Sequence, residues 1–399
     1  MTTSPALPTA VRLSSPPVRL ALAGAAALLL AACMPADAGT AGGSAPPQSA
    51  AVISVRPDGA KDWRPDRRVQ VAVVAGTLQD VTVTSADGRD VRGKVSRDGT
   101  RWTSKKPMLG FGTRYVVKVR AVDSEGLATV TRSTFRTEQP KSLVHSSILP
   151  GSGATVGVGM PVIVTFDAPV PNRAAAEQQL SVKSSPAQPG GWYWVSDTMV
   201  RYRPKTYWEA GTKVTVSSDL ADVRLGDGVW GDDNDTVTFG VGDAMISTVD
   251  IGQHQLTVRR NGEVLRTIPI TTGKTGWDTR QGVKVIISKD REVVMDAATL
   301  EVPKNSPDYY RLNVEYAMRV TWSGEYLHAA PWSVADQGHA NVSHGCTGMS
   351  TADAVWFYDN STVGDVVDYV DGVRSMEAWN GYTDWNLSWA QWKQGSALR

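Results

Sequence analysis

Apolar and polar side chains alternate with a period of two in short runs between residues 51 and 245. The runs "RRVQVAVVAG" and "QDVTVTSADG" show the pattern, and Asp87-Gly88 and Asp98-Gly99 mark turns between such runs. A strand with one buried face has this period, because successive side chains point to opposite faces. This part of the chain is therefore predicted to be all-β.

An internal repeat divides this region in two. Asp98 and Asp197 each stand fourteen residues before a triplet of Gly, Thr and a basic residue, and a strand-like run follows each triplet. The repeat predicts two immunoglobulin-like β-sandwich modules, at about 51–139 and 140–245. Neither module contains a clustered nucleophile and base, so we expect both to serve for spacing or docking.

A third region, at 246–373, also consists mostly of strand patterns. Its run "QLTVRRNGEVLRTIPITTG" predicts a hairpin with Asn261-Gly262 at the tip, since this pair readily takes two positive φ angles in succession. "STADAVWFYDN" is the one convincing helix pattern here, with Ser350 as N-cap and Asp353 three residues later. The predicted fold class is mainly β: two β-sandwich modules, then a β-rich third domain with one main helix.

The tail at 374–399 is rich in tryptophan. Trp385, Trp389 and Trp392 stand at positions i, i+4 and i+7, which share one face of a helix. We expect a helical tail whose tryptophan stripe packs onto the third domain. Contact with sugar or with a membrane is the alternative.

Residues 1–33 have the pattern of a targeting segment, which takes no part in the fold. Arg12 and Arg19 supply its basic part, and "LALAGAAALLLAAC" is an apolar core too short for a spanning helix. Leu30–Cys33 resembles a bacterial lipobox, so Cys33 is expected to be diacylated and to become the mature N-terminus. Acyl chains would then attach the protein to the outer face of the cytoplasmic membrane. Ordinary signal cleavage near "MPADAGTAGG" is the alternative.

Composition adds two expectations. Residues 34–50 are mostly Gly, Ala, Pro and Ser, and they are predicted to be a flexible linker because they cannot bury enough apolar surface to offset the entropy of ordering. The whole chain has 41 basic and 40 acidic residues and a formal net charge of +1. This balance indicates neither a nucleic acid nor an anionic membrane surface as a partner.

The segment "HANVSHGCTGMS" contains Cys346, which has no obvious disulfide partner. The chain has two cysteines, and lipidation would use Cys33. A free thiol is a liability in an oxidising compartment unless its chemistry is needed. The sequence therefore makes Cys346 a candidate nucleophile, with an inert buried cysteine as the alternative.

All five histidines precede Cys346. This order argues against papain-like peptidases, whose base follows the nucleophile, and the Ser-His-Gly-Cys context differs from the Thr-x-Thr-Cys strand end of sortases. His328, eighteen residues upstream, is a candidate general base from a neighbouring strand. His344 would point to the same side as Cys346 in an extended stretch, whereas His339 is expected to be only a loop residue.

A nucleophilic cysteine needs a lowered pKa, because the thiolate is the reactive form. We expect a nearby imidazole and the dipole of the helix capped by Ser350 to lower the pKa of Cys346. The amides of Gly345 and Gly348 are uncrowded, so we expect their N–H groups to point at a developing oxyanion.

Two metal sites are conceivable from ligand types alone. His328, His344 and Cys346 could bind zinc, but a fourth ligand and the usual paired spacing are missing. The acidic loop 225–235, "LGDGVWGDDND", could bind a hard cation, although a solvated loop is the simpler interpretation. We expect no metal and no cofactor.

The block "YLHAAPWSVADQGHANVSHGCTGMSTADAVWFY" resembles the active-site signature of the L,D-transpeptidases, the YkuD-type family, in which a histidine precedes Ser/Thr-His-Gly-Cys. The likeness extends to "TTGKTGWDTRQGVKV", "VVMDAATLEVPKNSPDYY" and the Trp-rich tail. Larger actinobacterial members also carry one or two immunoglobulin-like modules after a lipoprotein-type signal. The resemblance therefore covers essentially the whole chain from Cys33 onward.

The resemblance implies an enzyme that cross-links the cell wall. Cys346 would attack the carbonyl between the third and fourth residues of a peptidoglycan tetrapeptide stem, expel D-alanine and hold the rest as a thioester. His328 matches the general acid/base of the family, and His344 would tune and position the thiolate. Backbone N–H groups of Cys346 and its neighbours would form the oxyanion hole. The acceptor would be the side-chain amine of a diamino acid in a second stem, which gives a 3→3 cross-link.

The resemblance also implies residues that bind substrate. Tyr310 matches a flap tyrosine over the pocket, Met295 matches its apolar wall, and Trp332 lines the same cleft. Ser323 and Gly324 match a pair that contacts substrate. Carbapenem-type β-lactams are implied as inhibitors that acylate the nucleophile.

Two positions depart from the family pattern. Gly348 stands where many members have Asn, so an amide able to bind substrate is absent, and Ala329 stands where Ser is common. The second change is harmless if residue 329 orients the imidazole through its backbone carbonyl. Three alternative functions stay open: an L,D-carboxypeptidase with water as acceptor, an enzyme that anchors a protein to the wall, and a non-catalytic wall-binding scaffold.

Overall fold

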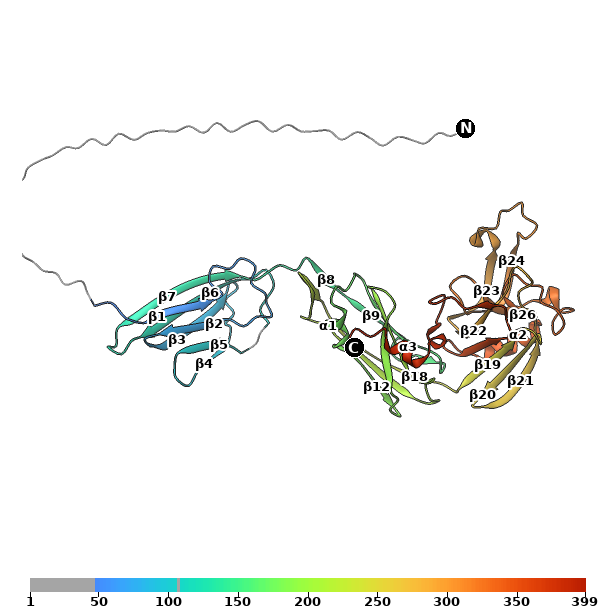
Figure 1. The fold of residues 1–399 in the computed structure, drawn as a ribbon, viewed down its shortest axis with the longest axis horizontal. Helices are drawn as coiled ribbons and strands as arrows, with labels where there is room; N and C mark the ends of the chain where they lie inside the picture. The colour runs from blue at the N-terminus through green and yellow to red at the C-terminus, as the bar shows by residue number, and fades with distance from the viewer. Residues whose placement is uncertain (1–46, 106–107) are drawn as a thin grey trace, which may run out of the picture. The chain divides into compact units, whose positions relative to one another are not determined.

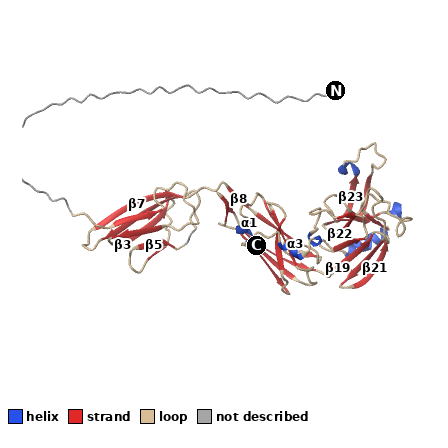
Figure 2. Cartoon of the chain, in the orientation of Figure 1, coloured by secondary structure: helices blue, strands red, loops and turns tan. Residues whose placement is uncertain are grey.

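Strands form nearly all of the regular structure in the computed structural model, which describes residues 47–105 and 108–399 (Figures 1 and 2). The mainly β fold class is therefore confirmed. The predicted targeting segment with Cys33, and residues 34–46 of the predicted linker, lie outside the described residues. None of the described helices is long and apolar enough to cross a membrane.

The first module is a sandwich of two sheets, as the alternating pattern predicts. One sheet has the strand order β1 (Val52–Arg56), β2 (Gln70–Val74), β5 (Arg101–Ser104) and β4 (Gly93–Val95). The other has the order β3 (Thr77–Ser85), β6 (Arg114–Val122) and β7 (Ala128–Arg136). Buried residues alternate with exposed ones along β6, and Tyr115 stacks on Phe135 of β7 with ring centroids 5.1 Å apart.

The second module contains three sheets, and its hydrophobic core also includes Val285 and Val366 of the third domain and Tyr382 of the tail. The first has the order β10 (Thr155–Val156), β18 (Asn234–Val241), β15 (Lys213–Asp219) and β12 (Leu180–Ser185). The second has the order β13 (Gly190–Trp194), β14 (Met199–Pro204), β11 (Val162–Phe166) and β9 (Ser146–Leu149). The smallest has the order β16 (Arg224–Gly226), β17 (Val229–Gly231) and β8 (Ser142–Val144), and one short helix, α1 (Arg173–Glu177), completes the module.

The third domain is built on two sheets. The larger has the order β21 (Glu263–Pro269), β20 (Gln255–Arg260), β19 (Met245–Asp250), β27 (Val366–Val370), β22 (Arg280–Val285) and β28 (Arg374–Ser375). The smaller has the order β23 (Ser288–Asp296), β24 (Arg311–Arg319), β25 (Tyr326–Ala329) and β26 (Thr347–Met349). Its main helix is α2 (Thr351–Asn360), and apolar side chains from both sheets and from α2 share one core.

Two local predictions in this domain are confirmed. Asn261 and Gly262 have φ angles of 53° and 90°, and they form the tip between β20 and β21. Ser350 caps α2, because its hydroxyl oxygen accepts from the backbone N–H of Asp353 at 3.1 Å. Both signals are local in sequence, which explains why they can be read without the rest of the fold.

The tail differs from the prediction in two ways. It forms two short helical segments, a 3₁₀ turn at Asp384–Asn386 and α3 (Trp389–Lys393), instead of one helix. Its tryptophans also pack onto the second module and not onto the third domain. The guanidinium of Arg203 lies 4.7 Å from the ring centroids of both Trp385 and Trp392. A buried guanidinium is stabilised by aromatic faces, so Arg203 provides the attachment that the stripe alone could not reveal.

The tail also contacts the third domain, through strand β28, through Asn380, which hydrogen-bonds to Ser323, and through Asn386. Asn386 accepts from the N–H of Val283 at 2.8 Å and donates to the carbonyl of the same residue at 2.7 Å. Trp392 donates from its indole N–H to the carbonyl of Gly191 in the second module at 2.8 Å. The tail therefore connects strand β22 of the third domain with strand β13 of the second module.

Candidate active site

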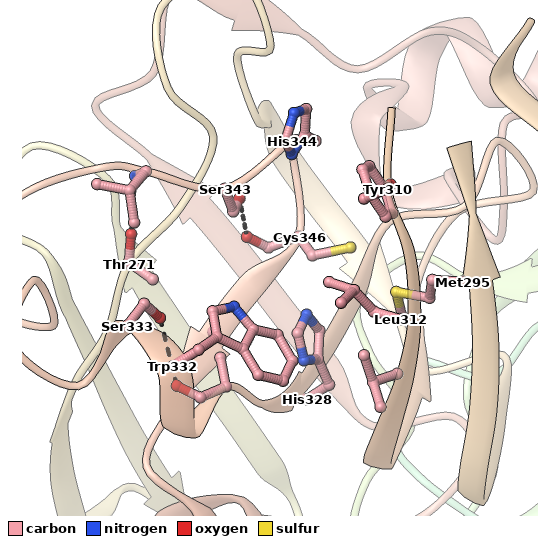
Figure 3. A pocket seen from close by; sticks show the side chains of 14 residues that line it. Thr271, Met295, Tyr310, Leu312, His328, Trp332, Ser333, Ser343, His344 and Cys346 are labelled. Atoms are coloured by element: carbon pink, nitrogen blue, oxygen red, sulfur yellow. Dashed lines mark hydrogen bonds between the residues drawn. The ribbon is translucent and has the colours of Figure 1, made fainter. Parts of the chain in front are cut away.

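A cavity of about 260 Å³ in the third domain contains most of the residues singled out by sequence (Figure 3). Its lining includes Met295, Tyr310, His328, Trp332, His344, Cys346 and Gly348. Ser323 and Gly324 do not line this cavity. They line two neighbouring ones, of about 220 and 480 Å³, and Tyr310 borders all three. Cys33 lies outside the described residues.

Two neighbouring parallel strands bring Cys346 and His328 together. Cys346 directly precedes β26, and His328 lies in β25, where it is in register with Gly348 of β26. Figure 3 shows both side chains among those that line the cavity. The prediction that His328 comes from a neighbouring strand is therefore correct.

His328 is held in one tautomer. Its Nδ1 atom lies 2.7 Å from the carbonyl oxygen of Ala329. Because a carbonyl can only accept, Nδ1 carries the proton and Nε2 has a free lone pair. Burial lowers the pKa of His328, so the neutral ring is favoured near neutral pH. Ala at position 329 keeps this carbonyl, so the departure from Ser leaves the orientation of the imidazole intact.

The thiol of Cys346 does not have the lowered pKa that we expected. Burial raises the pKa of Cys346 to about 12, an effect that a hydrogen bond with the backbone of Tyr326 and, to a smaller extent, the charge of Lys284 only partly oppose. The dipole of α2 does not lower the pKa of Cys346. All of β26 separates Cys346 from the cap at Ser350, and the dipole acts only within about one turn of the helix end. The thiol is neutral at rest, and Sγ lies 3.7 Å from the carbonyl oxygen of Gly324.

His344 lies in the same cavity as Cys346, but not because the chain is extended. Gly345 has a φ of +118°, which turns the backbone between the two residues. The imidazole lies between two aromatic rings, 4.9 Å from Trp277 and 4.8 Å from Tyr310. Its Nε2 atom is 3.6 Å from Asp308 Oδ1, which is too long for a hydrogen bond. Burial and the charge of Lys274 lower the pKa of His344.

The two glycine amides expected to bind an oxyanion are already occupied. The N–H of Gly348 donates to the carbonyl of Thr271 at 2.9 Å. The N–H of Gly345 donates to the hydroxyl of Ser343 at 3.1 Å, and this hydroxyl donates in turn to the carbonyl of Cys346 at 2.6 Å. This part of the prediction is wrong, because the absence of a side chain leaves a glycine amide accessible but does not leave it unpaired.

The hairpin of β23 and β24 supplies one wall of the cavity. Met295 lies near the end of β23, and Tyr310 directly precedes β24. Burial raises the pKa of Tyr310 to about 12, so its hydroxyl stays protonated and can donate. Trp332 lies on the opposite wall in the 3₁₀ turn Pro331–Ser333, with its ring 6.0 Å from that of His328 and 56% of its surface exposed.

Gly348 lines the cavity at a crowded point. A Cβ atom there would lie 2.9 Å from Cβ of Ala330 and 3.1 Å from Cγ2 of Thr271. Such distances are shorter than ordinary carbon contacts. The side chains around Gly348 therefore leave little room for the Asn that is common at this position in the family.

Sequence reasoning missed a buried ion pair next to the nucleophile. Nζ of Lys284, on β22, lies 2.5 Å from Oε2 of Glu325, and the second carboxylate oxygen accepts from Arg280 at 2.8 Å. Lys284 also lies 3.6 Å from the ring centroid of Tyr369. In the run "GVKVIISK" the lysine alternates with valines, which is the pattern of a solvent-facing residue. The pattern gives no signal that both faces of this strand are covered.

The described residues contain no group of three or more His, Cys, Asp or Glu side chains arranged to hold a metal ion. The acidic loop 225–235 forms the hairpin of β16 and β17. Its Asp227 pairs with Arg224, the residue directly before the loop. No described arrangement therefore supports the zinc or hard-cation alternatives.

The chain is similar to known proteins over most of its length. A family model for the bacterial Ig domain matches residues 60–224, and one for the L,D-transpeptidase catalytic domain matches residues 244–368. L,D-transpeptidase 2 of Mycobacterium tuberculosis is 40% identical over 341 residues, which are 85% of this chain and 83% of that protein. L,D-transpeptidase 1 of the same species is 44% identical over 225 residues, which are 56% of this chain and 84% of that protein.

A solved structure supports the same relationship. The L,D-transpeptidase LdtMt1 in complex with imipenem is 44% identical and aligns with a TM-score of 0.50. The alignment covers 56% of this chain and 97% of that one.

Proposed function

The chain belongs to the L,D-transpeptidase family, and we propose that it forms 3→3 cross-links in peptidoglycan through an acyl-enzyme on Cys346. The main support is the placement of Cys346 beside His328 on neighbouring parallel strands, inside one cavity. A thiol next to a neutral, fixed imidazole is the arrangement required for nucleophilic catalysis by cysteine.

The first step transfers the thiol proton from Cys346 to Nε2 of His328. Because the resting thiol has a raised pKa, this transfer and the attack on the carbonyl proceed together, and no stable thiolate forms beforehand. Sγ bonds to the carbonyl carbon between the third and fourth residues of a tetrapeptide stem. The resulting imidazolium of His328 then gives its proton to the leaving D-alanine amine, and a thioester remains on Cys346.

The second step reverses these roles. The side-chain amine of a diamino acid in a second stem attacks the thioester carbonyl. His328 takes a proton from this amine, and the proton returns to Sγ as the thiol leaves. The product is a new amide bond between two stems, and the enzyme regains its resting state.

We assign the surrounding residues to binding and positioning. Tyr310 borders the cavity of Cys346 as well as those lined by Ser323 and Gly324, so it is placed to cover donor and acceptor peptides alike. Met295 and Trp332 supply apolar walls. Gly348 shapes the floor without donating its amide. His344 is a positioning residue, and the aromatic rings around it hold the loop that carries Cys346.

The N-terminal segment and the modules complete the proposal. Cys33 would carry the acyl anchor at the outer face of the cytoplasmic membrane, and the modules at 51–139 and 140–245 would hold the catalytic domain (246–373) and its tail (374–399) within the cell wall. Metabolic labelling with a fatty-acid probe tests the anchor. Label is expected in the natural chain and not in Cys33→Ala.

Inhibition by carbapenems follows from the same nucleophile. A strained β-lactam amide stands in for the donor bond, so a carbapenem is expected to acylate Cys346. A relative has been solved in complex with imipenem. Intact-protein mass measured after incubation with imipenem should rise by one adduct, and Cys346→Ala should show no adduct.

The decisive test is intact-protein mass spectrometry with a disaccharide-tetrapeptide donor. The expected result is D-alanine release, a thioester mass on the protein and cross-linked dimers, all absent from Cys346→Ala. His328→Gln should retain the fold and slow D-alanine release by about 10²–10⁴-fold. Tripeptides without dimers would identify a carboxypeptidase. Transfer only to a protein amine would identify an enzyme that anchors a protein to the wall. If no thioester forms at all, the chain is a non-catalytic wall-binding scaffold.

A further inference from the structure

Charge is distributed very unevenly along the chain. Residues 51–139, the first module, contain seventeen Lys and Arg against ten Asp and Glu, a net charge of +7. The rest of the chain contains 24 basic and 30 acidic residues, a net charge of −6. The whole-chain charge of +1 gave no indication of an anionic partner only because these two parts cancel.

Five of these basic side chains lie on one face of the first module. In β6 the buried residues alternate with exposed ones, so every second side chain points outward from the sheet. The same holds for the second half of β7. The exposed basic residues on this outward face are Arg114, Lys118, Arg120, Arg132 and Arg136.

The strand register places like charges directly opposite each other. Arg114 is paired with Arg136, and Lys118 is paired with Arg132, in the antiparallel ladder of β6 and β7. Like charges at directly opposed positions destabilise a sheet. One acidic residue, Asp80 of β3, is in register with Arg120.

None of the ion pairs described for this module neutralises the five residues. These pairs join Arg64 to Asp66 and Arg89 to Asp87, and neither pair includes a residue of the outward face. The five positive charges therefore repel one another in the free protein, and a bound anionic partner would remove this repulsion.

The geometry suits a flat partner. From Arg114 to Arg120 the face extends about 20 Å at ~3.4 Å per residue, and it is at least two strands wide. It is an open sheet surface and not a groove, so it can lie against a plane of charged groups. Anionic phospholipid headgroups present such a plane, and each basic residue near it adds to the attraction.

The length of the preceding chain also favours a membrane. Seventeen residues separate Cys33 from Ala51, the first residue of the module. Even fully extended, this segment reaches only about 60 Å. If Cys33 carries the proposed acyl anchor, the module stays within that distance of the bilayer surface. A soluble wall polymer would have no comparable constraint.

We propose that the outward face of β6 and β7 binds the anionic phospholipids of the membrane to which the chain is tethered. The charged face follows from the residues and the strand register alone. The choice of a membrane as its partner rests on the lipid anchor of the proposed function. Binding through this face supplies a second, electrostatic attachment beside the acyl chains, and it fixes which side of the first module faces the bilayer.

The test uses the chain from residue 34 onward, which has no acyl group, and vesicles of equal parts phosphatidylglycerol and phosphatidylcholine. Sedimentation measures the bound fraction. Binding is expected at low salt, is lost at high salt because the charges are screened, and is absent with phosphatidylcholine alone. The double variant Lys118→Gln/Arg132→Gln should weaken binding by roughly 25-fold, at about fivefold for each basic residue.

Two matched variants locate the effect. Lys183→Gln/Lys213→Gln removes two exposed strand lysines from the second module and should leave binding unchanged. Lys94→Gln/Arg101→Gln removes charge from the other sheet of the first module and should have a much smaller effect than the β6–β7 variant.

Three results would overturn the proposal. The first is equal binding to neutral and anionic vesicles. The second is an equal loss of vesicle binding in all three double variants. The third is a preference for soluble polyglycerol phosphate over vesicles, which would identify a wall polymer as the partner. D-alanine release from a soluble tetrapeptide is measured on the same samples. Because no variant touches the catalytic cavity, failure of catalysis and failure of membrane binding appear in separate assays.

Discussion

The ammonium group of Lys284 lies 2.5 Å from the carboxylate of Glu325, and both side chains are buried beside the nucleophile. Glu325 follows Gly324, whose carbonyl oxygen lies 3.7 Å from Sγ of Cys346. Lys284 in turn lies against the ring of Tyr369, whose hydroxyl is 3.0 Å from that of Thr347, the residue after Cys346. The ion pair thus supports the backbone on both sides of the thiol.

Glu325→Gln is predicted to destabilise the fold strongly. The substitution preserves shape but leaves the charge of Lys284 without its counter-ion in a buried site, where such a loss typically amounts to about 3–5 kcal/mol. Denaturant unfolding measures the change. Asp87→Asn, which removes an exposed ion pair with Arg89, is the control and should leave the midpoint unchanged. Equal midpoints for the two variants would contradict the prediction.

Lys284→Met is predicted to make Cys346 harder to ionise. Lys284 lowers the pKa of the thiol, which burial raises to about 12, so loss of the cation raises that pKa further. Burial lowers the pKa of Lys284 itself to about 8, so the cation acts on the thiol only below that pH. The rate of alkylation by iodoacetamide, measured by mass, should therefore be lower for the variant below about pH 8, and the two rates should converge above it. Lys289→Met removes a different lysine of the same domain, which is only partly buried and does not act on Cys346, and this variant should follow the natural profile. If Lys284 only stabilised the fold, alkylation of Lys284→Met would depend on pH in the same way as alkylation of the natural chain.

The parts of this structure that could be predicted from sequence depend on short-range signals. The turn at Asn261-Gly262 and the cap at Ser350 follow from the conformations of two to four adjacent residues. The pairing of His328 with Cys346 required only one further step, that two short strands eighteen residues apart lie side by side.

The parts that could not be predicted depend on what covers each side chain. Lys284 alternates with valines as a surface residue would, yet Glu325 and Tyr369 enclose it from distant strands. The tryptophans of the tail show an apolar stripe, but where they pack depends on distant partners in the second module, namely Arg203 and the carbonyl groups of Gly159 and Gly191. Burial of Cys346 likewise decides the direction of its pKa, and local sequence does not report burial.

Gly348→Asn, which restores the residue common in the family, is predicted to destabilise this chain. The new Cβ would lie 2.9 Å from Cβ of Ala330, so neighbouring backbone must shift, at a cost of about 1–3 kcal/mol. D-alanine release should fall with it, because Ala330 adjoins the strand of His328. Gly240→Ala is the control, since the nearest atom to its Cβ would be 3.9 Å away. Full stability and activity of Gly348→Asn would contradict the prediction, because the side chains around position 348 would then move apart at little cost in free energy.

Trp392→Ala is predicted to detach the tail from the second module. The ring is fully buried, lies over Arg203 and donates to the carbonyl of Gly191, so its loss should reduce the free energy of unfolding by about 3–5 kcal/mol. Trp389→Ala is the matched variant, because that ring is half-buried and lies farther from Arg203, at 5.5 Å. Its effect should be clearly smaller. Thermal unfolding compares the two, and the reverse order would contradict the assigned packing.

Asp365 is predicted to make the fold less stable as pH rises from about 4 to about 7. Burial raises the pKa of this carboxyl from its ordinary value to about 7, although it accepts from the N–H of Thr362 at 2.6 Å. The folded chain therefore holds a proton that the unfolded chain has released, and this contribution is complete below pH 4 and disappears as pH passes 7.

The matching variant is Asp365→Asn, which keeps the shape and cannot ionise. Denaturant unfolding at several pH values should show a flatter profile for this variant, with the natural chain losing a few kcal/mol more across the same range. The direction is the informative result, because the usual exposed carboxylate in an ion pair produces the opposite slope, with stability lost as pH falls. Parallel profiles for the two proteins would mean that Asp365 is ionised in the folded state and that its surroundings admit water.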